Sequence, residues 1–353
     1  MATGFKKATV ASAKVAATQT NFPSYVDLSR LGITTQAEAD SVRVYADESK
    51  TTEWAREIVS ATEMHVKIPS LTSTTDMYVD WDGARSDYTT TATYGAEAVW
   101  SDYMAVYHMQ HSSGDATDST GNGRTLTNNN SVTYASAQIE NGSVYAKASK
   151  KNLSNSTNFV GAATSGVTTT AWVKVMTLPT NGYWSPVVMA SGGDSPYVSH
   201  QLGFYQYPTN TWTWVWGRTK HGVASSFTLT DATTPVADTW YKLTGTTDGT
   251  SRAEFYKDGT SLASTGSVDT GSGTNGTNAY RGFILGRENY TGDDSNNRYL
   301  DGVLDEVRIK TGAVTDDWET TEYNNQSDES TFWGTWTDAG GATATFTPKV
   351  TIF

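Results

Sequence analysis

Residues Thr168-Thr-Thr-Ala-Trp-Val-Lys-Val175 have the composition of a buried β-strand. β-Branched and aromatic side chains dominate it, as they do in strands that lie buried in a sheet. On both sides, turns rich in Gly, Asn and Asp separate it from further short runs of the same kind, which is the pattern of a two-sheet sandwich or jelly roll. The predicted strands are residues 100–109, 143–145, 168–175, 187–190, 201–207, 211–217, 226–229, 240–246, 253–257, 282–286 and 302–309.

A smaller set of strands precedes this one. A helix is predicted over residues 34–40, where a threonine caps the first turn. We expect a small β-sandwich-like domain in residues 1–90, a linker at residues 88–94, a jelly roll in residues 95–330 and an ordered C-terminal strand extension in residues 331–353. The strands predicted for the small domain are residues 8–10, 22–28, 42–44, 64–69 and 77–83.

The composition supports an all-β fold. The chain has 353 residues, which is enough for two domains, and 37% of them are hydrophobic and 18% charged, as in globular proteins. The sequence contains 31 Gly, 12 Trp and 19 Tyr but no long stretches rich in Leu, Glu and Lys. Half-buried strands joined by tight turns suit this mixture, so few helices are expected.

Charge and cysteine content exclude several classes of partner and site. The net charge of −12 repels phosphate backbones, so nucleic acid is not an expected ligand. Without any cysteine, neither disulfides nor thiolate metal sites can form. No run approaches about 18 apolar residues, so membrane insertion is not expected. Residues 1–10 lack the apolar segment of a signal peptide.

The strands carry the motifs of a known family. In the order found here, they resemble the laminin-G/concanavalin A-like jelly roll of lectins and glucanases. Those motifs are Val99-Trp100, Ala105-Val-Tyr-His-Met109, Ala171-Trp-Val-Lys174, Trp240-Tyr-Lys-Leu243, Glu254-Phe-Tyr-Lys-Asp-Gly259, Phe283-Ile-Leu-Gly286 and Gly302-Val-Leu-Asp-Glu-Val-Arg-Ile309.

The first domain resembles the small β-domain of unknown function that often precedes such jelly rolls in microbial surface proteins. The resemblance rests on Asn21-Phe-Pro23, Ser41-Val-Arg-Val-Tyr45 and His65-Val-Lys-Ile-Pro69. It is partial at Met77-Tyr-Val-Asp-Trp-Asp-Gly83, which stands where that family usually ends in Tyr-Tyr-Gly-Asn.

Three tryptophans at every second position are the best candidate for ligand recognition. Trp212, Trp214 and Trp216 share one face of a strand, and Tyr205 and Tyr207 would extend the strip across a turn. Sugar rings stack on such aromatic strips. The alternative, favoured by the large area that each tryptophan buries, is that the strip fills the core of the sandwich.

A loop rich in oxygen ligands suggests a structural calcium ion. Asp115, Asp118 and Asn122 lie close together in the sequence and supply the carboxylate and carbonyl oxygens that Ca²⁺ prefers. The resemblance implies a late partner on a closing strand, for which Asp305 is the candidate. The alternative is that Asp118 forms an Asx-turn and Asp305 accepts bonds from backbone amides.

No catalytic residues are predicted. Retaining glycosidases need two carboxyl groups about 5–5.5 Å apart. The pairs with suitable spacing on one strand, Asp80 with Asp82 and Asp301 with Asp305, both border turns.

Histidines give no clearer sign of catalysis. No Gly-x-Ser-x-Gly nucleophile elbow occurs. His108 and His111 are three residues apart and do not share a strand face, which favours solvated or locally bonded histidines over a metal pair.

Together these features predict a non-catalytic structural or adhesive protein on the surface of a virion, such as a capsid decoration, fibre or tail-associated protein. The small domain would attach to the particle, and the lectin-like domain would face outward. The expected partners are other virion proteins, further copies of the chain and a host-surface glycan, with residues 347–353 offered for strand addition. A secreted cell-surface adhesin and a polysaccharide-degrading glycoside hydrolase are the alternatives.

Overall fold

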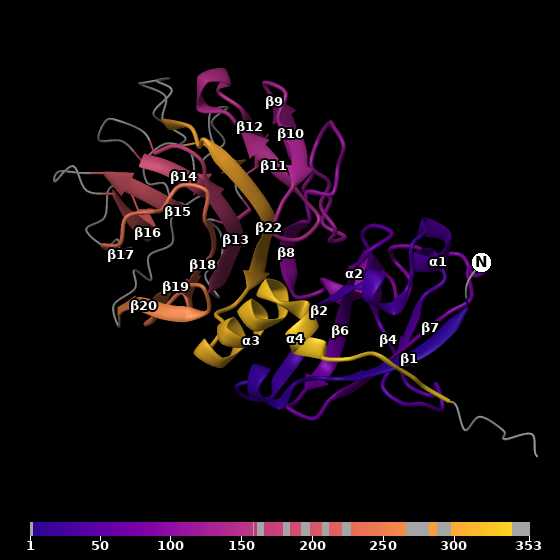
Figure 1. The fold of residues 1–353 in the computed structure, drawn as a ribbon. Helices are drawn as coiled ribbons and strands as arrows, with labels where there is room; N and C mark the ends of the chain where they lie inside the picture. Colours follow the sequence, from indigo (N-terminus) through magenta and orange to yellow (C-terminus); the bar gives the residue numbers. More distant parts are fainter. Residues whose placement is uncertain are drawn as a thin grey trace, which may run out of the picture.

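The molecule is an all-β protein with two domains, as predicted (Figure 1). The small domain holds the N-terminal strands, and the larger domain is a two-sheet jelly roll. Two helices near the C-terminus lie between them (Figure 1). The computed structural model describes residues 3–157, 159–160, 166–178, 184–191, 198–206, 212–220, 227–265, 282–287 and 298–340.

The first sheet of the jelly roll is antiparallel and is built around the buried strand predicted at residues 168–175. It contains β8 (Tyr103–Tyr107), β10 (Thr133–Ser136), β11 (Asn141–Tyr145), β13 (Val167–Val175), β18 (Trp240–Thr247), β19 (Ala253–Lys257), β20 (Thr260–Thr265) and β22 (Gly302–Thr311). The order is β10-β11-β22-β13-β18-β19-β20, and β8 also pairs with β22. Because β13 lies between β22 and β18, nearly all of its side chains are buried.

The second sheet of the jelly roll faces the first. Its order is β17-β16-β15-β14-β21-β12-β9. These strands are β9 (Thr127–Asn129), β12 (Asn152–Asn155), β14 (Trp184–Ser191), β15 (Val198–Gln206), β16 (Trp212–Lys220), β17 (Phe227–Asp231) and β21 (Phe283–Leu285).

The small domain also consists of two sheets. One has the order β23-β1-β7-β3-β4 and the other has the order β2-β6-β5. Their bounds are β1 (Gly4–Thr9), β2 (Gln19–Asp27), β3 (Arg43–Tyr45), β4 (Glu53–Trp54), β5 (Arg56–Ile58), β6 (Glu63–Leu71), β7 (Asp76–Trp81) and β23 (Thr337–Asp338).

Helices are few and short. The helix predicted over residues 34–40 is confirmed as α1, where the Thr35 side chain and Glu38 form a reciprocal capping box. None of the helices in the described ranges is long and apolar enough to cross a membrane. The helices are α1 (Gln36–Asp40), α2 (Ala96–Val99), α3 (Asp316–Ser327) and α4 (Glu329–Trp333), with short 3-10 helices at η1 (Ser12–Lys14), η2 (Leu28–Leu31) and η3 (Lys147–Ser149).

The C-terminal segment returns to the small domain instead of extending away from it. Trp318, Phe332, Trp333 and Trp336 are buried in the hydrophobic core of the small domain. Next, β23 pairs with β1. The predicted domain ends are therefore wrong in this respect: the small domain is completed by residues 314–338 because these aromatic side chains fill its core. Residues 347–353, predicted for strand addition, lie outside the described residues.

The jelly-roll core places a glycine beneath a tryptophan. Trp216 on β16 is fully buried, and its indole ring lies over Gly245 on β18 of the opposite sheet. A Cβ atom on Gly245 would lie 2.1 Å from the Trp216 ring. The two sheets can therefore approach each other here only because residue 245 has no side chain.

We expect Gly245→Ala to destabilise the protein by about 1–3 kcal/mol, because the added methyl group overpacks the core. Gly217→Ala is the matched control, since its Cβ would meet nothing closer than 3.4 Å. Urea unfolding followed by tryptophan fluorescence measures both. Equal midpoints for the two variants would contradict this account of the core.

Candidate functional site

The predicted tryptophan strip lies in the core. Trp214 and Trp216 have no exposed surface and Trp212 is 7% exposed, and all three belong to the main hydrophobic cluster of the jelly roll. Trp214 packs against Tyr241 of the opposite sheet, with ring centroids 4.9 Å apart. The prediction of a sugar-stacking surface on these three residues is therefore wrong, because the space between the sheets is filled by their rings. The side chains of Tyr205 and Tyr207 lie outside the described part of the structure.

The predicted calcium residues bind their own loops. The Asp118 carboxylate accepts bonds from the backbone amides of Thr120, Arg124 and Val106, which is the Asx-turn alternative with additional partners. Asp115 accepts a bond from the Asn128 amide.

The remaining two residues of the predicted calcium set are also bonded to backbone groups. Asn122 donates to the carbonyls of Tyr103 and Met104. Asp305 is fully buried and accepts from the Ile139 amide. Within the described ranges, the aspartates of this set do not belong to any group of three or more ligand side chains.

Two depressions open on loops of the jelly roll. The first, here called the loop depression, has a volume of ≈ 400 Å³. The second, the junction depression, has a volume of ≈ 450 Å³ and is lined by both domains and the linker between them. The loop depression is lined by Ser112, Ser113, Gly114, Asp115, Asn128, Ser131, Val132 and Thr133. The junction depression is lined by Glu57, Thr90, Ala96, Glu97, Thr117, Asp118, Ser119, Thr120, Gly121 and Gly123.

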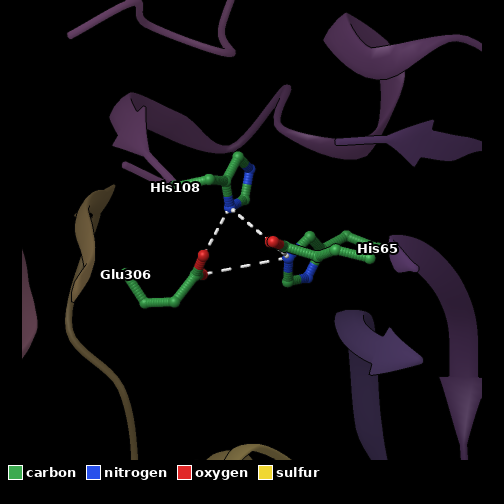
Figure 2. Close-up of side chains that lie close together, drawn as sticks. His65, His108 and Glu306 are labelled. Carbon is green, nitrogen blue, oxygen red and sulfur yellow. Dashed lines mark hydrogen bonds and ion pairs between the residues drawn. The ribbon is translucent and has the colours of Figure 1, made fainter. Parts of the chain in front are cut away.

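A cluster of four buried ionisable side chains lies where the two domains meet. Glu63 and His65 come from β6 of the small domain, His108 directly follows β8, and Glu306 lies on β22. Figure 2 shows His65, His108 and Glu306 pointing toward one another from three different segments. Ligand atoms of all four lie within 4.8 Å of one another, and no member is more than 4% exposed. We call these four residues the junction cluster.

Strand alternation and one irregularity place these side chains. On β6, Met64 and Val66 point into the core of the small domain, so Glu63 and His65 point the other way, toward the jelly roll. On β22, Glu306 has a φ of 48°, where the pairing with β13 shifts register. At such a bulge, a side chain can point to the face of the sheet opposite to the one that regular alternation would give it.

Hydrogen bonds hold the junction cluster together. His108 Nδ1 lies 2.6 Å from Glu306 Oε1, and His65 Nε2 lies 2.9 Å from Glu63 Oε1. The two imidazole rings stack with centroids 4.5 Å apart. At the edge of the cluster, Glu57 Oε2 lies 3.0 Å from His108 Nε2.

The charges continue from the cluster to α3. Arg308 donates from Nε to Glu306 at 3.0 Å and from Nη1 to Glu322 at 3.0 Å. Lys242 on β18 donates to Glu322 at 3.0 Å and to Glu319 at 2.6 Å. All of these side chains are at most 3% exposed, so the network is a chain of alternating charges inside the protein.

The electrostatics of the cluster assign the charges to particular groups. Burial opposes ionisation of His108, but the carboxylates of Glu306 and Glu57 raise its pKa well above 6.5. Burial likewise opposes ionisation of Glu306, but His108 and Arg308 hold its pKa well below 4.5. Burial and Glu306 raise the pKa of Glu63 well above 4.5, and burial and His108 lower the pKa of His65 well below 6.5.

Comparison with known families assigns the larger domain. A family model described as the concanavalin A-like lectin/glucanases superfamily matches residues 141–318, half of the chain. The chain belongs to the concanavalin A-like lectin/glucanase superfamily. The resemblance noted from the sequence is thus confirmed, and the matched residues include β13, β18 and β22 of the first sheet.

Some solved structures are similar to this chain at low sequence identity. Domain 4 of an extracellular arabinanase from Geobacillus stearothermophilus, in complex with arabinotriose, is 19% identical with a TM-score of 0.45, and the match covers 62% of this chain and 97% of that one. The binding domain of Paraclostridial Mosquitocidal Protein 1 is 13% identical with a TM-score of 0.46, covering 63% and 52%.

A Trypanosoma rangeli sialidase is 14% identical with a TM-score of 0.45, and here the match covers 68% of this chain and 34% of the sialidase. This chain thus spans only about half of the mosquitocidal binding domain and a third of the sialidase. No curated protein matches the sequence.

The superfamily includes glucanases, and hydrolysis of a glycosidic bond requires two accessible carboxyl groups. Asp80 is bonded to Lys50 and Arg85, and Asp82 accepts from the backbone amides of Ala84 and Arg85. These contacts give both carboxylates a structural role at the end of β7.

In the other pair, Asp305 is inaccessible to a polysaccharide. Asp305 is fully buried beneath Ile139, so a glycosidic bond cannot reach it. Burial and Glu306 raise the pKa of Asp305 well above 3.8.

The sequence did not reveal the junction cluster. The histidine prediction is wrong for His108, which is neither solvated nor bonded only locally: its partners Glu57 and Glu306 are remote in the sequence. It holds for His111, whose ring accepts from the nearby Thr117 amide. The signal that was available is the alternation of charged residues along β6, which resembles a solvent-facing strand.

We expect Lys242→Met to cost about 3–5 kcal/mol of stability, because it leaves Glu319 and Glu322 buried without their shared cation. The surface pair of Lys7 with Asp76, whose side chains are 34% and 33% exposed, supplies the control. Lys7→Met should cost no more than about 1 kcal/mol. Thermal unfolding of both variants tests the difference, and a loss for Lys242→Met as small as the control's would refute the role of the network.

Proposed function

We propose that the protein is a non-catalytic, adhesive surface protein whose jelly roll binds glycans while the small domain holds it in a fixed position. The observation that carries the proposal is the junction itself, in which buried charges of both domains are paired. A mobile linker would break the contacts of Glu57 with His108 and of His65 with Arg308, so the jelly roll is presented rigidly. Membership of a lectin/glucanase superfamily supports a carbohydrate as the ligand.

The fixed carboxylates support a binding role over catalysis. A general acid and a nucleophile must both reach the scissile bond. Asp305 is fully buried, and the carboxylates of Asp80 and Asp82 are bound to neighbouring cations and amides. Asp305 therefore lacks the access that hydrolysis of a polysaccharide requires, and Asp80 and Asp82 are held by other partners.

The loop depression is the glycan site that we favour. Its lining offers hydroxyl, amide and carboxylate groups, which are the partners of sugar hydroxyls. Tyr134 lies beside it and donates from its hydroxyl to the Gly114 carbonyl, and the His111 ring packs edge-on at 5.5 Å. An aromatic ring next to converging polar groups suits the two faces of a sugar.

We expect the purified protein to bind a subset of glycans on an array, and Thr133→Arg to reduce that binding at least about tenfold by filling the loop depression with a long side chain. Thr133 is exposed, so the fold should be unaffected. Thr117→Arg, at an exposed position of the junction depression, is the matched control and should leave glycan binding unchanged.

If Thr117→Arg loses glycan binding and Thr133→Arg does not, the glycan site lies in the junction depression and not in the loop depression. If no glycan on the array binds the protein, the proposal that its ligand is a carbohydrate is wrong. Turnover of β-glucans or agar-type polysaccharides, abolished in Asp301→Asn or Asp305→Asn, would instead favour the glycoside hydrolase.

The location that we propose is the surface of a virus particle, with the small domain as the attachment point and several copies of the chain assembled together. An acidic, threonine-rich β-protein without cysteine suits an extracellular particle. A secreted cell-surface adhesin remains the rival. Light scattering should give a mass of at least twice the 38.1 kDa of one chain. Gold-labelled antibodies against the protein should decorate virus particles in electron micrographs. A monomer that labels only cell envelopes would favour the adhesin.

A further inference from the structure

The junction cluster has the dimensions of a metal site. A tetrahedral ion with ligands at about 2.0–2.1 Å holds its ligand atoms about 3.3 Å apart. His65 Nε2 lies 2.9 Å from Glu63 Oε1 and 3.9 Å from Glu306 Oε2. His108 Nδ1 lies 3.4 Å from Glu63 Oε1 and 2.6 Å from Glu306 Oε1. These four separations lie on either side of the value expected for such an ion, and the two to Glu306 end on different oxygens of its carboxylate.

We propose that Glu63, His65, His108 and Glu306 bind one divalent transition-metal ion of the zinc class, which joins the two domains. Two imidazoles and two carboxylates form a mixed nitrogen and oxygen set that suits Zn²⁺ better than Ca²⁺, which takes six or more oxygen ligands. Two ligands come from each domain, so the ion stabilises the junction. This inference is independent of glycan binding.

The surroundings of the cluster match those of protein-bound metals. A ligating histidine usually donates its other ring nitrogen to a carboxylate, which orients the ring. Here Glu57 Oε2 lies 3.0 Å from His108 Nε2, and Glu57 is itself fixed by a bond from Trp100 Nε1. Arg308 binds the Glu306 carboxylate and so orients a second ligand.

An unsatisfied oxygen points to a missing ligand. Glu63 is fully buried, and its Oε2 atom has no hydrogen-bond partner among the described residues. A buried carboxylate with an unpaired oxygen is costly, and a cation bound through Oε1, which faces both histidines, offsets the cost of burying this group. A divalent ion also neutralises the two buried carboxylates of the cluster together.

The contacts of His65 indicate which of its two ring nitrogens would bind the ion. Its Nε2 atom faces Glu63, whereas Nδ1 lies 3.4 Å from Arg308 Nη2, at the outer limit of a hydrogen bond. Coordination through Nε2 places the proton on Nδ1 and lengthens this weak contact. Arg308 keeps its bonds to Glu306 and Glu322 in that arrangement.

A route to the site starts at the junction depression. Glu57 lines this depression and contacts His108 directly, so its carboxylate separates solvent from the cluster. Glu97 and Asp118 also line the depression and give it an acidic rim. Such a rim attracts cations, and a shift of the Glu57 side chain would admit one.

The test uses the full chain, purified without a polyhistidine tag and treated with a chelator. Titration calorimetry with Zn²⁺ should give one site per chain, and Co²⁺ should produce the intense visible absorption of tetrahedral coordination. Zn²⁺ should also raise the melting temperature, whereas Ca²⁺ should not. A protein that binds neither Zn²⁺ nor Co²⁺ at a stoichiometric site overturns the proposal without any variant.

Variants identify the ligands. Glu63→Gln keeps the shape of the side chain but removes the charged ligand, so the Zn²⁺ affinity should fall more than about 100-fold. Glu57→Gln retains an acceptor for His108 but removes its charge, so it should lower the affinity about tenfold, less than the loss of a direct ligand. Glu140→Gln, at an exposed carboxylate near the junction, is the matched control and should bind Zn²⁺ like the unmodified protein. Unchanged affinity in a folded Glu63→Gln variant would place the ion elsewhere and refute the assignment.

Discussion

The structure depends on charges that are buried between two sheets of different domains. β6 presents Glu63 and His65, and β22 presents Glu306 and Arg308, to a space that excludes water. A charge removed from water is tolerated only where it is paired and hydrogen-bonded. Across the domain boundary, Glu57 contacts His108 and Arg308 contacts His65, so these contacts favour one register of docking. Apolar surfaces alone could slide past one another without the free-energy cost of leaving a buried charge unpaired.

Helix α3 extends the same principle to both domains. Glu319 and Glu322 bind Lys242 and thereby anchor the helix on the jelly roll. Asn325 accepts from the Tyr25 amide and donates to the Tyr25 carbonyl, so the same helix is anchored on β2 of the small domain. Because hydrogen bonds are directional, these polar contacts set the orientation of the helix more narrowly than apolar packing would.

The strands could be predicted because apolar residues alternate along them, but the same pattern does not show what each face meets. The two-residue period of a strand correctly predicts that Trp212, Trp214 and Trp216 share one face. That face lies in the core because the other sheet packs against it, with Gly245 beneath Trp216. The polar face of β6 has the sequence of a solvent-facing surface. Its partner Glu306 lies far along the chain and reaches it through a bulge, which no local pattern indicates.

Helix α3 and the strands β9 and β12 are not predicted from the sequence because they lack apolar periodicity. Helix α3 buries glutamates, an asparagine and a glutamine, so its sequence shows no hydrophobic stripe. The strands β9 and β12 consist largely of Asn, Thr and Ser and resemble turn material. In each case the partner that stabilises the element lies elsewhere in the chain. Sequence patterns therefore predict which segments are extended, and they do not predict which polar groups will be buried together.

If the jelly roll binds glycans as proposed, a rigid junction affects how strongly several copies attach together. Single sugar sites bind weakly, and useful adhesion requires several sites to engage at once. Each site that moves freely on a linker loses conformational entropy when it binds, and this loss weakens the combined attachment. Docking of the jelly roll through Glu306, Arg308 and α3 removes that freedom before any ligand arrives. The buried charges that make the junction costly to assemble are thus the same features that would let repeated copies act together.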